Sequence, residues 1–184
     1  MVTLLVILGI VVVLVLVVIG AYNGLVQLRV SVQNAWSQID VQLKRRHDLI
    51  PNLVETAKGY MAHERGTLES VTKARQMAVD ASSIKDKLAA ENVLTSTLRS
   101  LMAVSENYPN LKADQTMMRL QEELTTTENK IGFARQYYND EVNRLNTAVQ
   151  SFPGNIISGQ FGFKAAEFFQ VEAPEDRQAP QVKF

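Results

Sequence analysis

Residues 40–60 read DVQLKRRHDLIPNLVETAKGY, and they decide how the helices of this chain connect. Apolar side chains recur at helical steps on both sides of a proline, which is typical of one helix face. They are Leu43, Ile50, Leu53, Ala57 and Tyr60. A chain reversal at the proline predicts an antiparallel up-and-down four-helix bundle with long helices. A kinked but continuous helix predicts one long arm instead, and the spacing allows both.

A helix joint is one interpretation of this stretch. Lys44, Arg45 and Arg46 fall where cations stabilise the C-terminal end of a helix dipole. Asp48 lies where the N-cap of a next helix would be, and Pro51 falls in that helix's first turn, where its missing N–H does little harm. On this interpretation Arg45, Arg46, Asp48 and Pro51 form a structural joint rather than a catalytic cluster.

Residues 2–21, VTLLVILGIVVVLVLVVIGA, carry no charge over 20 positions. At about 1.5 Å per residue, a helix of this length covers the roughly 30 Å hydrocarbon core of a bilayer. A cleaved signal peptide normally has a cationic start, a shorter apolar stretch and a cleavage site of small residues, and none of these is clear here. We therefore expect a transmembrane anchor over residues 1–22.

The cations that flank this segment predict its orientation. No lysine or arginine precedes it, whereas Arg29 and the cations at 44–46 follow it. Cytoplasmic flanks of membrane spans are enriched in lysine and arginine. The body of the chain is therefore expected in the cytoplasm.

Helical spacing continues through most of the remaining sequence. One segment is predicted from Leu53 to Ala78, and another from Ile84 to a turn in NYPN at residues 107–110. The clearest segment repeats every seven residues, at Met117, Leu124, Ile131, Tyr138, Leu145 and Phe152. A seven-residue repeat indicates helix-on-helix packing, and no alternating strand pattern competes with it. The sequence therefore predicts an all-α bundle domain over residues 23–152.

The tail, residues 153–184, is rich in Phe, Gly and Pro and cannot form one regular helix. Phe161, Phe163, Phe168 and Phe169 are costly to leave in water, so we expect them to form an interaction element. A groove of a neighbouring subunit, the chain's own bundle and the membrane surface could cover them, in that order of preference. The part after Glu172 is expected to be largely disordered.

Composition and motifs argue against several classes of function. The formal net charge is zero and the pI is about 6.7, so nucleic acid is not an expected partner. The chain has no cysteine, and its two histidines, His47 and His63, do not form an HExxH zinc motif. No GxSxG elbow or phosphate-binding loop is present either. We therefore expect no enzyme, and no catalytic, cofactor or metal site.

The sequence resembles the LemA family of bacterial membrane proteins. The resemblance rests on YNGLVQLRVSVQNAWSQIDVQLKRRHDLIPNLVETAKGY directly after the apolar segment, YPNLKA at 108–113, ENKIGFARQYYND at 128–140 and FPGNIISGQFGF at 152–163. It implies a single N-terminal anchor, a cytoplasmic up-and-down helical bundle and no established enzymatic activity. It therefore favours the four-helix bundle over the long arm, and it supplies no catalytic residues.

Two functions fit these expectations. The first is a non-enzymatic scaffold that self-assembles at the bacterial cytoplasmic membrane, with membrane lipids and copies of itself as partners. The second is an adaptor that presents a groove or its tail to another membrane protein, such as an enzyme, protease or receptor. A hydrolase or metal enzyme would need a site that the sequence does not show.

Overall fold

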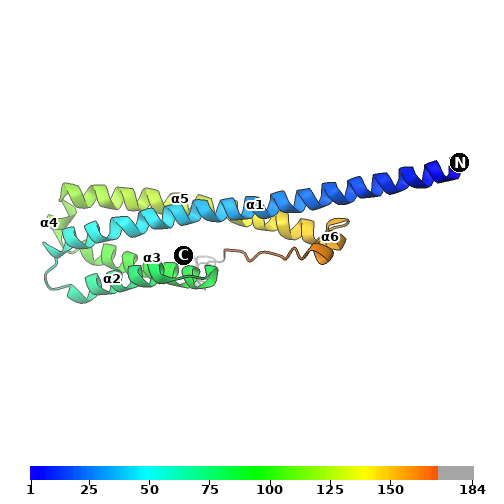
Figure 1. Cartoon of the computed structure of the whole chain (residues 1–184). Helices are drawn as coiled ribbons and strands as arrows, with labels where there is room; N and C mark the ends of the chain where they lie inside the picture. The colour runs from blue at the N-terminus through cyan, green and yellow to red at the C-terminus, as the bar shows by residue number, and fades with distance from the viewer. Residues whose placement is uncertain (170–184) are drawn as a thin grey trace, which may run out of the picture. The chain divides into compact units, whose positions relative to one another are not determined.

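The computed structural model describes residues 1–169, and these residues are mostly helical and contain no strand (Figure 1). The helices are α1 (Val2–Lys58), α2 (Arg65–Asp80), α3 (Ile84–Ser105), α4 (Pro109–Lys112), α5 (Gln115–Gln150) and α6 (Gly154–Phe161). The predicted all-α class is therefore confirmed. The disorder expected after Glu172 falls outside the described residues.

The chain divides into two compact units, and the long helices α1 and α5 contribute to both. The first unit comprises residues 1–41 and 131–168. The second comprises residues 42–130 and a part that begins at Phe169. Each unit is described by itself below.

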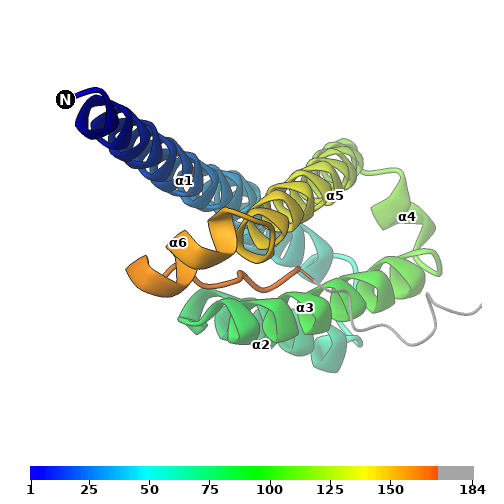
Figure 2. The same ribbon diagram turned by 90° about the vertical axis from the view of Figure 1, so that its right-hand side faces the viewer.

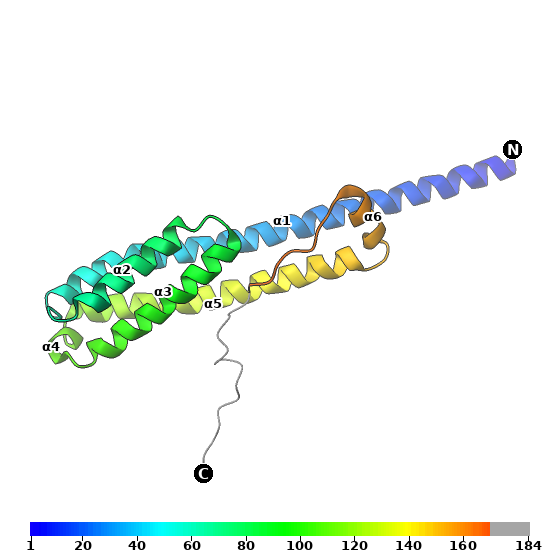
Figure 3. The same cartoon turned by 90° about the horizontal axis from the view of Figure 1, so that it is seen from below.

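The second unit is built from four helical segments around one hydrophobic core. α2 and α3 lie side by side (Figure 3), and the C-terminal part of α1 and the N-terminal part of α5 complete the set. Short connections between consecutive helices make neighbours antiparallel. Every segment contributes side chains to the core, among them Ile50, Leu53, Leu68, Val71, Leu94, Leu101, Met117 and Leu124.

Local capping explains where two of these helices begin. Ser83 is the N-cap of α3, because its Oγ accepts a hydrogen bond from the Asp86 backbone N–H at 3.0 Å. Asp114 plays the same part for α5, since its Oδ1 accepts from the Met117 N–H at 2.9 Å. Between the two helices, Pro109 starts the single turn of α4, where a missing N–H costs nothing.

The structure corrects the predicted joint at Arg45, Arg46, Asp48 and Pro51. α1 continues through Pro51 to Lys58, and the chain reverses over residues 59–64 instead. The continuous alternative is therefore correct for α1. The predicted segment from Leu53 to Ala78 is likewise wrong, because the reversal divides it.

Two contacts explain why α1 can continue through a proline. Pro51 has no N–H, so the carbonyl of His47, four residues earlier, loses its partner within the helix. The Nε of Arg75 on α2 donates to that carbonyl at 2.7 Å. Leu43 and Leu53, on either side of the proline, are both buried on the core face, so packing favours an unbroken helix.

The seven-residue repeat of α5 is confirmed over most of its length. Met117, Leu124, Ile131, Tyr138 and Leu145 are all buried. The repeat ends there, because α5 stops at Gln150 and the Phe152 side chain is 80% exposed.

In the first unit, α6 and an extended segment after it pack beside the C-terminal part of α5 (Figure 2). Leu25 of α1, Ile157 of α6 and Phe163 form a small buried cluster. The turn into α6 requires glycine, because a Cβ on Gly154 would lie 2.1 Å from the Ala148 carbonyl oxygen. Gly162 ends α6 in the left-handed conformation, with φ of 73°.

α1 begins with the apolar segment at residues 2–21, whose side chains are mostly exposed. Within the described residues, α1 is the one helix that is long and apolar enough to cross a membrane, judged by length and composition.

Candidate functional site

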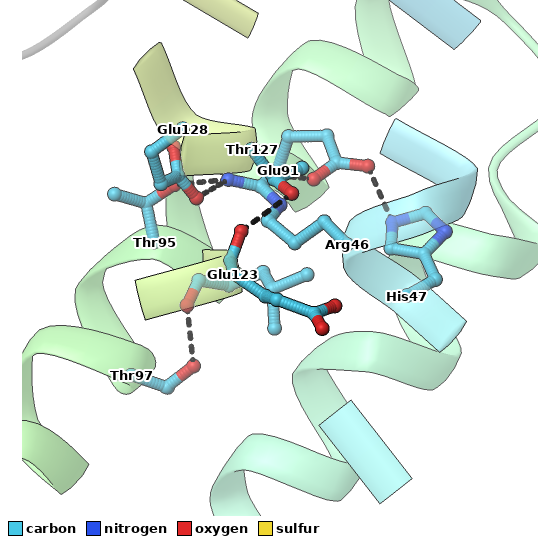
Figure 4. A network of polar contacts seen from close by, with 9 residues as sticks. Arg46, His47, Glu91, Thr95, Thr97, Glu123, Thr127 and Glu128 are labelled. Carbon is cyan, nitrogen blue, oxygen red and sulfur yellow. Dashed lines mark hydrogen bonds and ion pairs between the residues drawn. The ribbon is translucent and has the colours of Figure 1, made fainter. Parts of the chain in front are cut away.

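A buried arginine lies at the centre of the main polar network of the second unit (Figure 4). Arg46, on α1, pairs with Glu91 on α3 and with Glu128 on α5. It also donates from Nη1 to the Thr95 hydroxyl at 3.1 Å. His47 joins the network through its Nε2, which is 2.7 Å from the second Glu91 oxygen. One cation therefore links three helices through side chains.

Burial differs sharply among these charged groups. The side chains of Arg46 and Glu91 are 0% and 1% exposed, whereas that of Glu128 is 39% exposed. A buried ion is stable only when its partners replace the water it has lost. Arg46 and Glu91 do this for each other, and Glu128 joins the network to the surface. Removal of either buried partner would leave the other as an uncompensated charge.

The network has the composition of a cross-link between helices. The carboxylates accept hydrogen bonds from Arg46, and His47 contacts one of the same carboxylates. Arg46 also donates to the hydroxyl of Thr95. In this arrangement Arg46 on α1 joins a carboxylate of α3 to a carboxylate of α5. Among the described residues, no group of three or more His, Cys, Asp or Glu side chains could hold a metal ion.

The described residues of the second unit form at least two concave surfaces. A groove of about 710 Å³ runs between α3 and α5, and its lining includes the network residues Thr95 and Glu128. Charged Arg99, Glu106 and Lys112 also line this groove. A second concavity, of about 880 Å³, is lined by the end of α1, the following turn and α2.

The structure brings only one of the four predicted joint residues into the network, and that residue is Arg46. Arg45 is half exposed, with Nη2 3.9 Å from a Glu123 carboxylate oxygen. Asp48 and Pro51 are exposed on α1. The basic stretch is therefore split between a buried cation and solvent-facing residues.

Sequence reasoning missed Glu91, Thr95 and Glu128 as partners. A signal was present, because Glu91 lies three residues before Leu94 and seven before Leu98, on the buried stripe of α3. Arg46 likewise lies on the buried face of α1, between Leu43 and Ile50. A charge on each of two buried stripes is a signature of an internal ion pair.

The structure brings only some of the predicted tail phenylalanines together. In the first unit the rings of Phe161 and Phe163 pack edge-on against Tyr22, with centroid distances of 5.0 and 5.6 Å. Phe163 is buried, and the Arg29 guanidinium lies 5.1 Å from its ring centroid. Its cover comes from its own chain, the second of the three sources expected.

The other tail phenylalanines have different surroundings. Phe161 and Phe168 are 55% and 41% exposed, whereas Phe169 is buried.

Side chains of α5 hold the extended segment after α6. Asn146 donates from Nδ2 to the Ala166 carbonyl at 2.9 Å and accepts the Ala166 N–H on Oδ1 at 2.8 Å. The Tyr138 hydroxyl donates to the Glu167 carbonyl at 2.9 Å. Burial, followed by the charge of Glu167, raises the pKa of Tyr138. Three side-chain hydrogen bonds to its backbone therefore tie the segment to α5, in addition to the packing of Phe163.

Two tyrosines bridge the turns at one end of the second unit. The Tyr60 hydroxyl donates to Asp114 Oδ2 at 3.0 Å, and this bond raises the pKa of Tyr60. The Tyr108 hydroxyl donates to Glu64 at 3.2 Å, and burial, with this bond, raises the pKa of Tyr108. Hydrogen bonds from backbone N–H groups, chiefly that of Met117, lower the pKa of Asp114.

The fold and the polar network define an all-α bundle protein with an apolar N-terminal helix segment. A family model described as the LemA family matches residues 35–184, and this chain belongs to that family. The resemblance noted in the sequence is therefore confirmed.

Curated relatives carry two kinds of name. Magnetosome protein MamQ 2 of Paramagnetospirillum magneticum is 26% identical, with 84% of this chain and 66% of the relative covered. Magnetosome protein MamQ of Magnetospirillum gryphiswaldense is 24% identical with the same coverage. Protein LemA of Metamycoplasma hominis is 24% identical, over 85% of this chain and 72% of the relative. The chain thus spans 66% of the length of the MamQ relatives.

Proposed function

We propose that this LemA-family chain is a membrane-anchored, non-enzymatic scaffold that assembles with copies of itself at the bacterial cytoplasmic membrane. The observation that carries the proposal is an exposed aromatic pair on α5. Phe133 is 73% exposed and Tyr137, one helical turn later, is 44% exposed. Both lie on the same side of the helix, because residues four apart are neighbours on a helix surface.

The energetics of this pair favour a protein partner. Burial of one Phe side chain contributes roughly 1.5–3 kcal/mol, so two adjacent aromatic rings in water forgo a substantial stabilisation. Aromatic side chains are enriched at the centres of protein interfaces. A second copy of the chain presents the same pair, and an isologous contact would bury both pairs together.

Membrane anchoring is supported by the apolar segment of α1. Its side chains at residues 2–21 are mostly exposed, and its length suits a bilayer. A non-enzymatic role is supported by the polar network, whose carboxylates are engaged by Arg46. The names of the relatives, magnetosome protein and protein LemA, state no reaction.

Molar mass in mild detergent tests self-assembly. The full-length chain should form an oligomer, measured by light scattering after size exclusion and corrected for bound detergent. The double variant Phe133→Ser with Tyr137→Ser should shift to a smaller species. Met118→Ser is the matched control, since Met118 is 48% exposed on the same helix, and it should keep the wild-type mass. A monomeric wild type would contradict the scaffold.

The adaptor remains the second candidate, and the groove between α3 and α5 favours it. That groove has a volume of about 710 Å³, and apolar Leu98 and Leu124 line it together with charged residues. This combination suits a bound peptide segment. Thr125→Arg would place a bulky cation in the groove. If the wild type is monomeric and binds one defined membrane protein, and this variant loses that binding, the adaptor replaces the scaffold.

A further inference from the structure

We propose that α6 and its flanking residues rest on the membrane surface, as a second point of contact beside the apolar segment of α1. This inference rests on the proposed membrane anchor. It concerns residues of the first unit alone.

The first argument is the position of α6, which the aromatic contacts of Tyr22 place next to the end of the apolar segment. Tyr22 directly follows the uncharged segment at residues 2–21. If that segment fills the hydrocarbon core, Tyr22 lies at the headgroup level, where tyrosine is enriched. The Phe161 ring centroid, at the end of α6, is 5.0 Å from that of Tyr22. This contact puts the end of α6 at the level where the span leaves the bilayer.

Composition is the second argument. Residues 152–163, FPGNIISGQFGF, contain no charged residue, in a chain of which 21% of residues are charged. Within this stretch Phe152 is 80%, Ile156 63% and Phe161 55% exposed. Ile157 and Ser158 of α6 are buried, so this part of the helix packs on the unit. Ile156 lies roughly 100° around the helix axis from Ile157 and is exposed.

Charges near the stretch complement a lipid surface. Arg29 is exposed on α1, two helical turns beyond Tyr22, and its guanidinium lies 5.1 Å from the Phe163 ring centroid. Lys164 is the first charged residue after the uncharged stretch, and it is exposed. Anionic headgroups attract lysine and arginine close to the surface. The apolar residues would then enter the interface while these cations remain at headgroup depth.

Single cysteines test the proposal, because the chain has none of its own. The full-length protein is reconstituted into phosphatidylcholine–phosphatidylglycerol vesicles and labelled with a polarity-sensitive fluorophore at Ile156→Cys or, separately, Phe152→Cys. Val12→Cys reports the span. Ser37→Cys, exposed on α1 and roughly 22 Å beyond Tyr22 at 1.5 Å per residue, is the aqueous control. Quenching is measured with iodide in water and with lipids brominated near the headgroup or near mid-chain.

Labels at 156 and 152 should be quenched by the shallow brominated lipid and protected from iodide. The Val12 label should respond to the deep brominated lipid, and the Ser37 label to iodide. If the Val12 label is in lipid but the α6 labels respond to iodide as the Ser37 label does, this inference fails and the anchor stands. Protection of the α6 labels from both quenchers means that protein covers them, which also overturns it. A Val12 label outside lipid removes the anchor and the inference together.

Discussion

Arg46 and Arg45 are adjacent in sequence but lie in opposite environments. The Arg46 side chain is fully buried between carboxylates of α3 and α5, whereas the Arg45 side chain is 51% exposed. Loss of one partner from a buried ion pair destabilises far more than loss of an exposed pair, because the remaining charge stays desolvated. The two arginines therefore give a matched test of the network.

Arg46→Met should lower the free energy of unfolding by about 3–5 kcal/mol, since it leaves Glu91 buried without its cation. Arg45→Met, the same substitution one residue earlier, should change it by less than about 1 kcal/mol. Urea unfolding of the full-length chain in mild detergent, followed by circular dichroism, measures both. Addition of Glu91→Leu to Arg46→Met should recover part of the loss. Equal effects of the two arginine variants would contradict the buried network.

Asp114 gives a pH-dependent contribution at the residue scale. Its pKa lies below the ordinary 3.8, chiefly because the Met117 N–H donates to the ionised carboxylate. A carboxyl with a lowered folded pKa stabilises the fold above its unfolded pKa, and this contribution is lost as the pH falls through the folded value. Between about pH 5 and about pH 2, wild type should therefore lose more stability than Asp114→Asn, which still caps α5 but does not titrate there.

Thermal unfolding of both proteins across this range checks the prediction. Tyr60→Phe is an informative third variant, because it removes one bond to the carboxylate and keeps the cap. Its pH dependence should lie between those of the other two. Parallel pH profiles for wild type and Asp114→Asn would refute the role of this carboxyl.

At the scale of the element, α1 is a long helix that contains a proline, and a side chain of α2 bonds the carbonyl that the proline leaves without a helical partner. The His47 carbonyl has no partner at Pro51, and Arg75 of α2 donates to it instead. The proline ring is exposed, so its removal disturbs no core contact. The proline and the arginine should therefore be energetically coupled.

Pro51→Ala should stabilise the chain by up to about 3 kcal/mol, because alanine restores an N–H for the His47 carbonyl. Arg75→Met should destabilise wild type by roughly 1.5–3 kcal/mol, the range for a hydrogen bond to a charged group. In the Pro51→Ala background the same change should cost clearly less. A double-mutant cycle by urea unfolding measures this coupling. Additive effects would show that Arg75 does not compensate for the proline.

Repeating apolar positions made much of the element structure predictable. The buried positions of α5 from Met117 to Leu145 and the start of α3 at Ile84 follow from spacing and from the Ser83 cap. The end of α1 did not follow, because a proline and three cations suggested a boundary near Pro51. The continuation of α1 through Pro51 involves a bond from Arg75, which is 28 residues from His47 in sequence. Rules based on neighbouring residues do not include such a contact. Tertiary contacts overrode the local signal.

The candidate site was less predictable for the same reason. Arg46 stood out as a cation, but its partners Glu91 and Glu128 lie 45 and 82 residues away. Only their positions relative to buried stripes signalled an internal pair. The tail phenylalanines were recognised as apolar surface, yet the packing of Phe163 on Tyr22 depends on how α6 turns back at Gly154. Long-range pairing of this kind follows from the fold, not from local sequence.

At the scale of the whole molecule, the proposed scaffold requires that the chain face one side of the membrane. Arg29 and the cations at 44–46 follow the apolar segment, and cytoplasmic flanks of membrane spans are enriched in such residues. A reporter active only in the cytoplasm, fused after Phe184, should therefore be active. Three lysines inserted before Val2 should partly invert the orientation and lower that activity, whereas three glutamines should not, because only cations carry the bias. Activity of a reporter that works only outside the cytoplasm, in the unmodified chain, would overturn both the orientation and assembly on the cytoplasmic face.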